Sequence, residues 1–123
     1  MDTVPLHPDR WSVWDIVRVD FPFADRAAAR ERPALVVAAI PVHADFSILW
    51  LAMITSASAG RWPFDVAISD LKAGDLLRPC FVRTSKIAAI DARLAIRTGM
   101  LASIDRQAVA ATLRTILAPA LTP

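Results

Sequence analysis

The most constraining feature of this 123-residue chain is a pair of strand-like segments joined by a charged loop that ends in Arg32-Pro33. In the first segment, residues 13–21, apolar and charged side chains nearly alternate, which predicts a strand with one face in water. The second segment, residues 34–40, is continuously apolar, which predicts a strand covered on both faces. Because Pro33 restricts the preceding residue to extended conformations, we expect Arg32 at a stiffened position beside a buried strand.

Further strand signals follow at short intervals, and the chain then ends in a helical pattern. We predict strands over residues 47–54, 62–68, 80–85 and 95–98, a turn or short helical piece over 69–77, and a strand end with a turn over 87–94. Many short strands followed by one helix predict a mainly β fold, either a strongly bent antiparallel sheet or a small barrel. We favour the barrel.

The C-terminal helix is predicted from apolar side chains that recur on one face, at Val109, Leu113, Ile116 and Leu117. Ser103 is positioned to cap this helix, and Asp105 lies in its first turn, where a negative charge is favoured. We interpret residues 1–123 as a single domain, with 1–11 as a loose lead-in and 118–123, which carry two prolines, as a frayed tail.

Composition limits the class of protein without naming a partner. The formal net charge is only +2, so any preference for an anionic partner must come from local placement of charge. No apolar run is long enough to span a bilayer and the first ten residues lack the pattern of a signal peptide, so we expect a cytoplasmic protein without membrane contact. The single cysteine, Cys80, excludes an internal disulfide and a cysteine-cluster zinc site. His7 and His43 are expected to be solvated, and we predict neither a metal nor a cofactor.

Several motifs occur in an order that is similar to one known family. They are WDIVRVDFPF from Trp14, RPALVV from Arg32, the step Ile54-Thr55-Ser56, WPFDVAI from Trp62 and the segment 77–90. Together they resemble the MazF/PemK toxins of bacterial type II toxin–antitoxin pairs over about residues 14–117. The spacing of the Arg-Pro-Ala step between Val-Asp-Phe and Thr-Ser carries most of the resemblance.

The resemblance implies a mainly β fold, an SH3-like small barrel of the CcdB/PemK type with a C-terminal α-helix, usually as a homodimer. It also implies a metal-independent, sequence-preferring endoribonuclease that acts on single-stranded RNA, often messenger RNA, and so inhibits translation and growth. In this family the 2′-hydroxyl attacks the adjacent phosphate and leaves a 2′,3′-cyclic phosphate and a 5′-hydroxyl. A cognate antitoxin, expected from an adjacent gene, covers the groove and blocks it.

By the same resemblance, the catalytic positions are Arg32 and Thr55, with Ser56 as a second hydroxyl or N–H donor. A rigid guanidinium is well suited to stabilise the negative charge of a phosphorane, but its pKa is too high for a general base, which we leave unassigned. From the residues alone, a surface salt bridge of Arg32 with Asp20 or Glu31 would be the preferred interpretation, and the family spacing reverses that preference. Without the resemblance, Thr55 and Ser56 would be interpreted as turn formers after a strand.

RNA binding would need cations and flat side chains along a groove. The candidates are Phe21, Phe23, Arg26, Arg30, Arg61, Trp62, Arg83 and Lys86. The alternatives are a solvated face for the arginines and core packing for at least two of the three aromatic residues. Trp50, between two leucines, is expected in the core or in a dimer interface.

Departures from the family pattern keep a rival hypothesis open. Trp14 replaces a glycine, Cys80 a serine, Lys86 a glutamine and Ala88 an arginine, which puts sequence specificity in doubt. The rival is a noncatalytic toxin or binding module on the same barrel, binding either gyrase or only antitoxin and RNA. The gyrase version uses a tryptophan near the C-terminus, whereas this chain ends Ala-Pro-Ala-Leu-Thr-Pro.

Overall fold

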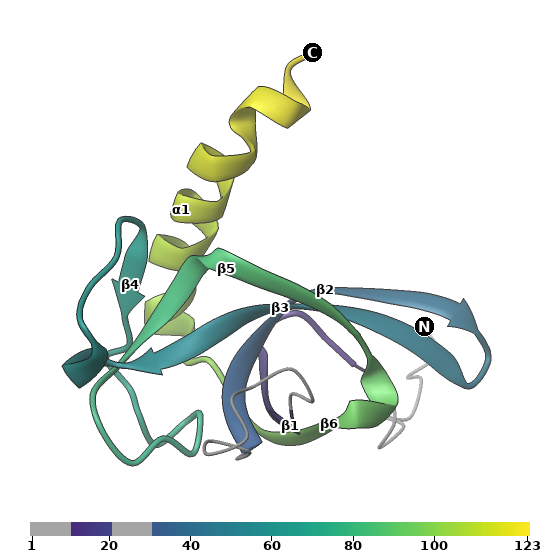
Figure 1. The fold of residues 1–123 in the computed structure, drawn as a ribbon, viewed down its shortest axis with the longest axis horizontal. Coiled ribbons are helices and arrows are strands. Elements are labelled where there is room, and N and C mark those ends of the chain that lie inside the picture. Colours follow the sequence, from purple (N-terminus) through teal and green to yellow (C-terminus); the bar gives the residue numbers. More distant parts are fainter. Residues whose placement is uncertain (1–10, 21–30) are drawn as a thin grey trace, which may run out of the picture.

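The structure, a computed structural model, describes residues 11–20 and 31–123. In chain order these residues form β1 (Asp15–Asp20), β2 (Glu31–His43), β3 (Phe46–Ser56), the 3-10 turn η2 (Ala57–Ala59), β4 (Asp65–Ala67), β5 (Cys80–Asp91), the 3-10 turn η3 (Ala92–Leu94), β6 (Ala95–Met100) and α1 (Ser103–Leu121). Figure 1 shows the strands curving around one another, with α1 leaving the sheet at one side. The predicted mainly β fold with a C-terminal helix is confirmed.

The strands of the described chain form one antiparallel sheet of six, in the order β4-β5-β3-β2-β1-β6. Among the described residues, no ladder joins the outer strands β4 and β6, so the sheet is bent but not closed. The small barrel that we predicted is therefore an open one. Three ladders, β1 with β2, β2 with β3 and β3 with β5, put β2 and β3 at the centre of the sheet, which explains why residues 34–40 are so uniformly apolar.

Both faces of β2 are buried at residues 34–36, as its apolar run predicted, whereas residues 37–39 are half-buried and Ile40 is exposed. Leu35 belongs to one core cluster, with Ile16, Ile54, Val82 and Val109 of α1 among its members. The flanking residues Ala34 and Val36 belong to a second cluster on the opposite face, with Val17, Val19, Leu49 and Leu51. Because side chains alternate along a strand, one continuous apolar segment serves both clusters.

Our prediction that residues 80–94 form two elements, divided at Lys86, was wrong. Residues 80–91 form one strand, β5, whose register against β3 shifts between the pairs Ala52↔Ile87 and Met53↔Arg83. The residues between these pairs are left unpaired with β3, and such a bulge bends a strand without ending it. The polar step 84–86, which resembled a boundary, is this bend.

Two predictions about α1 also need correction. The residue at the N-cap position is Ala102, without a side-chain hydrogen bond, so Ser103 does not cap the helix. The helix continues through Pro119 to Leu121, so the tail is not frayed from residue 118. Proline removes a single backbone hydrogen bond near an exposed helix end, where water can satisfy the freed carbonyl. Among the described residues, no helix has the length and apolar character required to cross a membrane.

Candidate active site

The predicted catalytic residues come together where β2 begins and β3 ends. The two strands are antiparallel neighbours, with Ala34 opposite Met53, so Arg32 at the start of β2 lies beside Thr55 and Ser56 at the end of β3. A cavity of about 350 Å³ opens there. It is lined by Arg18, Arg32, Pro33, Ile54, Thr55, Ser56, Ala59, Leu76, Leu77, Arg78 and Cys80.

The structure does not show the alternative considered for Arg32, which was a surface salt bridge with Asp20 or Glu31. Arg32 is exposed, and within the described residues it makes no ion pair with Asp20 or Glu31. Its place in the sheet is nevertheless fixed, because it pairs with Val19 of β1. A guanidinium on a fixed backbone, with its charge not neutralised by a described neighbour, is free to bind an anion.

Thr55 and Ser56 were predicted either as hydroxyl groups that bind a ligand or as turn formers, and the structure treats the two residues differently. The Ser56 hydroxyl lies 2.9 Å from that of Ser58 and accepts a weak hydrogen bond from the Ser58 N–H at 3.4 Å, as a turn former does at the start of η2. The Thr55 hydroxyl has no hydrogen bond to another described residue. Thr55 therefore keeps its donor available to a ligand, while Ser56 helps to turn the chain.

Two arginines that we did not single out also line this cavity. Arg18 lies on β1 opposite Pro33, and Arg78 comes from the loop that leads into β5. The lining residues, all of them described, include no aspartate, glutamate or histidine. With Arg32, the cavity therefore concentrates positive charge and suits an anionic ligand such as a phosphate group. It holds no group that acts as a base near neutral pH.

Cys80 closes one side of the cavity and is chemically quiet. Burial raises the pKa of the Cys80 thiol, and the charges of Arg78 and Arg18 oppose this effect without cancelling it. The thiol donates a hydrogen bond to the Arg78 carbonyl at 3.0 Å. A protonated, buried thiol is a poor nucleophile, so Cys80 is not suited to that role.

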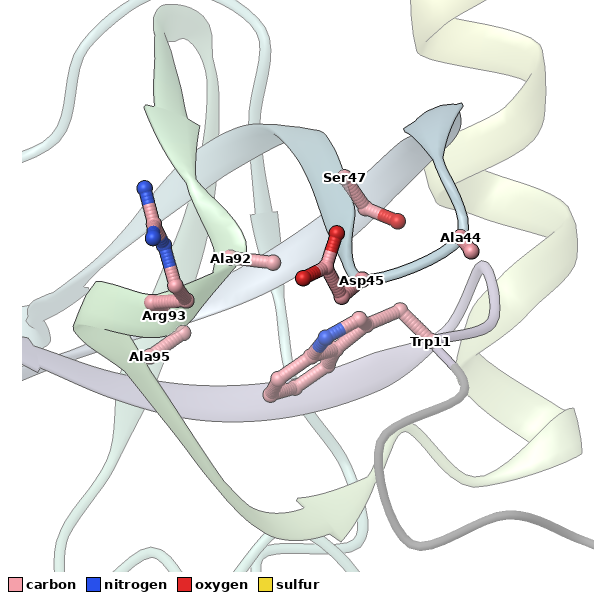
Figure 2. A pocket seen from close by; sticks show the side chains of 7 residues that line it. All are labelled: Trp11, Ala44, Asp45, Ser47, Ala92, Arg93 and Ala95. Atoms are coloured by element: carbon pink, nitrogen blue, oxygen red, sulfur yellow. The ribbon is translucent and has the colours of Figure 1, made fainter.

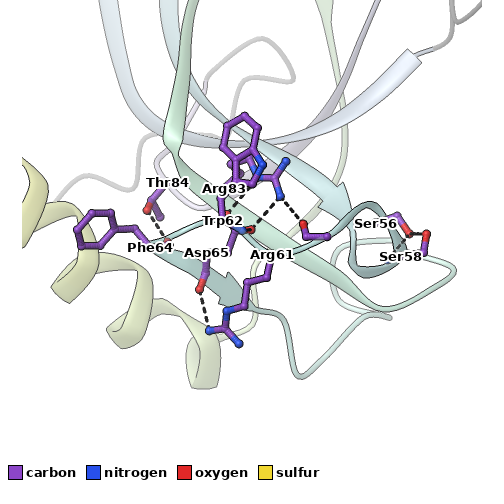
Figure 3. A network of polar contacts seen from close by, with 9 residues as sticks. Ser56, Ser58, Arg61, Trp62, Phe64, Asp65, Arg83 and Thr84 are labelled. Carbon is purple, nitrogen blue, oxygen red and sulfur yellow. Dashed lines mark hydrogen bonds and ion pairs between the residues drawn. The ribbon is translucent and has the colours of Figure 1, made fainter.

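Arg83, a predicted RNA-binding residue, is instead buried in a separate polar network (Figure 3). Cross-strand pairing places Asp65 of β4 opposite Arg83 of β5. The guanidinium contacts both carboxylate oxygens, at 3.2 and 2.9 Å, and donates to the Gly60 carbonyl at 2.7 Å. A buried cation needs these partners, so Arg83 has a structural role here, and its contact with RNA stays a prediction that its burial disfavours.

The other two residues predicted in this region flank the same ion pair. The ring of Trp62 lies 3.9 Å from the Arg83 guanidinium carbon, and Arg61 donates to the Asp65 carbonyl at 3.2 Å. The backbone N–H of Trp62 also donates to the Asp65 carboxylate at 2.8 Å. Burial alone would raise the pKa of Asp65, but these hydrogen bonds and the nearby positive charges hold it below its ordinary value. Trp62 and Arg61 remain exposed, so their RNA contacts stay predictions.

The remaining candidates are not gathered at the cavity. Lys86 is exposed on the bend of β5. Phe21, Phe23, Arg26 and Arg30 lie outside the described residues, as does His7. His43 is exposed at the far end of β2, where its ring lies 6.4 Å from that of Phe46.

A larger cavity, about 480 Å³, lies at that far end of the sheet (Figure 2). Its charged lining residues are Asp45 and Arg93. Arg93 is already paired with Asp91 at 2.6 Å, so this cavity lacks the unbalanced positive charge of the one around Arg32. In the part of the chain that the structure describes, no group of three His, Cys, Asp or Glu side chains is placed to hold a metal ion.

Comparison with known proteins agrees with this fold. The sequence model of the "PemK-like, MazF-like toxin of type II toxin-antitoxin system" matches residues 12–117. MazF (Form I) from Deinococcus radiodurans is similar, with a TM-score of 0.62 and 22% identity over 95% of this chain and 99% of that one. The MazE–MazF structure (Form II) from the same organism gives 0.61 and 20% over 94% and 97%.

At these identities the solved structures show the fold, while the sequence model shows the family. No curated protein sequence matches this chain. The matched segment includes β1 to β6 and most of α1, and therefore all the described residues that line the cavity around Arg32. This chain belongs to the PemK-like, MazF-like toxin family of type II toxin–antitoxin systems.

Proposed function

We propose that this chain is the toxin of a type II toxin–antitoxin pair and acts as a metal-independent, sequence-preferring endoribonuclease on single-stranded RNA, chiefly messenger RNA. One observation carries the proposal. The cavity around Arg32 and Thr55 holds unneutralised guanidinium groups and a free hydroxyl, and its lining residues, all described, include no carboxylate. Such a site attracts the phosphate backbone of RNA and disfavours acidic ligands.

The proposed chemistry follows from these groups. The RNA 2′-hydroxyl attacks the adjacent phosphorus, its oxygen displaces the 5′-oxygen, and the products are a 2′,3′-cyclic phosphate and a 5′-hydroxyl. Arg32 stabilises the charge that gathers on the non-bridging oxygens through paired N–H donors, and Thr55 donates its hydroxyl to the same phosphate. We also assign to Arg32 the donation of a proton to the departing 5′-oxygen. The group that accepts the proton of the 2′-hydroxyl is not assigned.

The test is cleavage of a long, weakly structured RNA by the purified protein in EDTA, with mapped ends. We expect cuts at short recurring sequences that leave cyclic phosphate. Arg32→Ala and Thr55→Ala should each lose activity, by about a thousandfold for Arg32 if it stabilises the transition-state charge. Both variants should keep the wild-type melting temperature, because neither side chain is buried.

Two outcomes would overturn parts of the proposal. If folded, antitoxin-free wild type cuts none of several RNAs, the noncatalytic reading replaces it, with the protein binding antitoxin, RNA or gyrase on the same barrel. If cutting survives Arg32→Ala, the enzyme stands and the site assigned here falls.

We further propose a cognate antitoxin and a homodimer as partners, in the cytoplasm. The similarity to a MazE–MazF structure supports the antitoxin. An exposed apolar surface supports the dimer: Trp50 is 45% exposed on β3, beside Ala38 of β2 and Ala89 of β5, and so is not in the core. Analytical ultracentrifugation of wild type and Trp50→Glu tests the dimer, since a charge at a buried interface should dissociate it. A monomeric wild type would contradict it.

A further inference from the structure

Arg18 and Arg78 line the cavity of Arg32 and Thr55, yet the proposed chemistry gives them no task. The paired N–H donors of the Arg32 guanidinium and the Thr55 hydroxyl are sufficient to bind the single phosphate that is cut. Single-stranded RNA presents a phosphate at every nucleotide, so a site that holds RNA meets more than the phosphate it cuts. The surplus of positive charge in the cavity suggests that a neighbouring phosphate is also held.

Arg18 is fixed where it lines the cavity. It is half-buried on β1, and its Nη2 donates to the Asp75 carbonyl at 3.2 Å. Asp75 has a φ of 58°, an uncommon backbone conformation for a residue other than glycine. One hydrogen bond occupies one of the five N–H donors of a guanidinium, so most of them remain available to a ligand.

Arg78 is held on a loop that is tied to the rest of the fold at two further places. The Asp105 carboxylate of α1 accepts hydrogen bonds from the Ser69 and Asp70 N–H groups, at 2.9 and 3.1 Å. In the middle of the loop, Ala73 accepts from the Met100 N–H at 3.0 Å. Pro79 then restricts Arg78 to an extended backbone at the entrance of β5. The loop therefore presents Arg78 from a defined wall of the cavity.

The charges of Arg18 and Arg78 lie in the same part of the cavity, near Cys80. Both are close enough to Cys80 for their charges to oppose the effect of burial on its thiol pKa. Neither forms an ion pair with an acidic residue in the described part of the chain. Like charges that share a cavity repel one another, and this repulsion is relieved when an anion binds between them.

We propose that Arg18 and Arg78 form a second phosphate subsite, which binds the RNA phosphodiester next to the one held by Arg32 and Thr55. The subsite rests on the proposed function for its ligand, RNA, but not for catalysis. It positions the RNA strand so that the scissile phosphate lies at Arg32. Arg18 and Arg78 are therefore positioning residues, and their loss weakens binding more than it slows the chemical step.

The test is a binding measurement that does not depend on cleavage. The probe is a fluorescent, mixed-sequence single-stranded RNA with 2′-O-methyl groups, which has no nucleophile, and anisotropy is measured over a range of salt concentrations. The variants are Arg78→Gln and Arg18→Gln. The matched control is Lys72→Gln, which removes a positive charge from an exposed position on the same loop outside the cavity. Melting temperatures verify folding, and Arg18→Lys separates the loss of charge from the loss of the bond to Asp75.

We expect Arg78→Gln and Arg18→Gln to bind about five- to tenfold more weakly near 0.1 M salt, each with a salt slope reduced by about 0.7, as for one lost phosphate contact. Lys72→Gln should bind as wild type does. On RNA that is cut, KM should rise while kcat changes little. Replacing alternate phosphates by neutral methylphosphonates should shrink the difference between wild type and Arg78→Gln.

The outcomes separate the two proposals. If both arginine variants keep the wild-type slope, or if Lys72→Gln lowers it as much, the subsite is wrong even if the wild type cuts RNA. If the wild type binds RNA with a slope that depends on Arg78 and Arg18 but cuts nothing, the subsite stands and the nuclease falls. A wild type that binds no RNA overturns the subsite.

Discussion

Two groups of arginines lie within one small domain and have opposite surroundings. Arg83 is 5% exposed, is held by both oxygens of Asp65, and lies under the ring of Trp62. Arg32, Arg18 and Arg78 line an open cavity and make no ion pair within the described residues. The chain links the two regions, because Ser56 ends β3 at the cavity and Gly60, four residues later, accepts from Arg83.

This difference shows that the role of an arginine depends on whether its guanidinium group is already paired with a carboxylate. A buried, fully paired guanidinium fixes backbone, and Arg83 fixes the segment from Gly60 to Asp65 that follows the Thr55-Ser56 step. An unpaired guanidinium at the surface leaves its donors for a ligand. The Arg83 network is therefore expected to control stability, and the cavity is expected to control activity.

The largest expected effect comes from breaking the buried pair. Asp65→Ala leaves the Arg83 guanidinium buried without a counter-charge and removes the acceptor of the Trp62 backbone N–H. We expect it to lower the free energy of unfolding by about 3 to 5 kcal/mol. Urea denaturation followed by tryptophan fluorescence measures the change.

The control is the exposed pair Asp91–Arg93, which is shorter, at 2.6 Å, than Asp65–Arg83, at 2.9 Å. Asp91→Ala should cause no measurable loss of stability, because solvent screens an exposed pair. Replacing both buried partners, as in Asp65→Leu with Arg83→Met, should recover part of the loss. Equal effects of Asp65→Ala and Asp91→Ala would contradict the distinction by burial.

The next effect separates charge from geometry in the cavity. Arg32→Lys keeps the positive charge but loses the planar fork of donors, so single-turnover RNA cleavage should slow by about 10- to 100-fold. The melting temperature should stay at the wild-type value because Arg32 is exposed. An Arg32→Lys protein that cuts at the wild-type rate would show that charge alone suffices there.

Acid should weaken the Arg83 network in a stated direction. The pKa of Asp65 lies below its ordinary value of 3.8 in the folded protein, because its hydrogen bonds and the neighbouring cations outweigh the opposing effect of burial. The stability that this shift provides is present above pH 3.8 and is lost as the pH falls through the folded pKa. Unfolding free energies of wild type and Asp65→Asn should therefore converge below pH 3.8. Asp91, whose pKa is also lowered, is common to both proteins and cancels. A constant difference down to acid pH would contradict this origin.

The fold was largely predictable because local patterns and tertiary structure agree. The continuous apolar run correctly indicated a strand covered on both faces, fully so at residues 34–36. The alternation before it wrongly indicated one face in water, because β1 contributes Ile16 to one core cluster and Val17 and Val19 to the other. The bend of β5 was missed, since its step of polar residues has the composition of a boundary. Residues 80–91 stay in one strand because they pair with residues that are distant in the sequence, and the local pattern of apolar and polar residues does not predict this pairing.

The cavity was predictable in part. Arg32 and Thr55 came from family spacing, but Arg78 offered the same signal as Arg32, an Arg-Pro step ahead of a strand, and was overlooked. Arg18 was interpreted as part of a wet face, although it shares the parity of the buried Ile16. Arg83 could not be separated from these residues by sequence, because its partner Asp65 meets it only through the pairing of β4 with β5.

The smallest expected effect decides whether Trp62 belongs with Arg83 or with the RNA. Its ring is 46% exposed and lies 3.9 Å from the Arg83 guanidinium carbon, an arrangement whose cation–π attraction contributes about 1 kcal/mol at a partly exposed site. Trp62→Leu keeps apolar contact but loses this attraction, so we expect a loss of about 1 kcal/mol in unfolding free energy. Affinity for the 2′-O-methyl RNA should not change. If stability is kept and affinity falls, Trp62 stacks on bases as the sequence suggested, and the division between a structural and a binding group of arginines has to be redrawn to place this ring at the RNA.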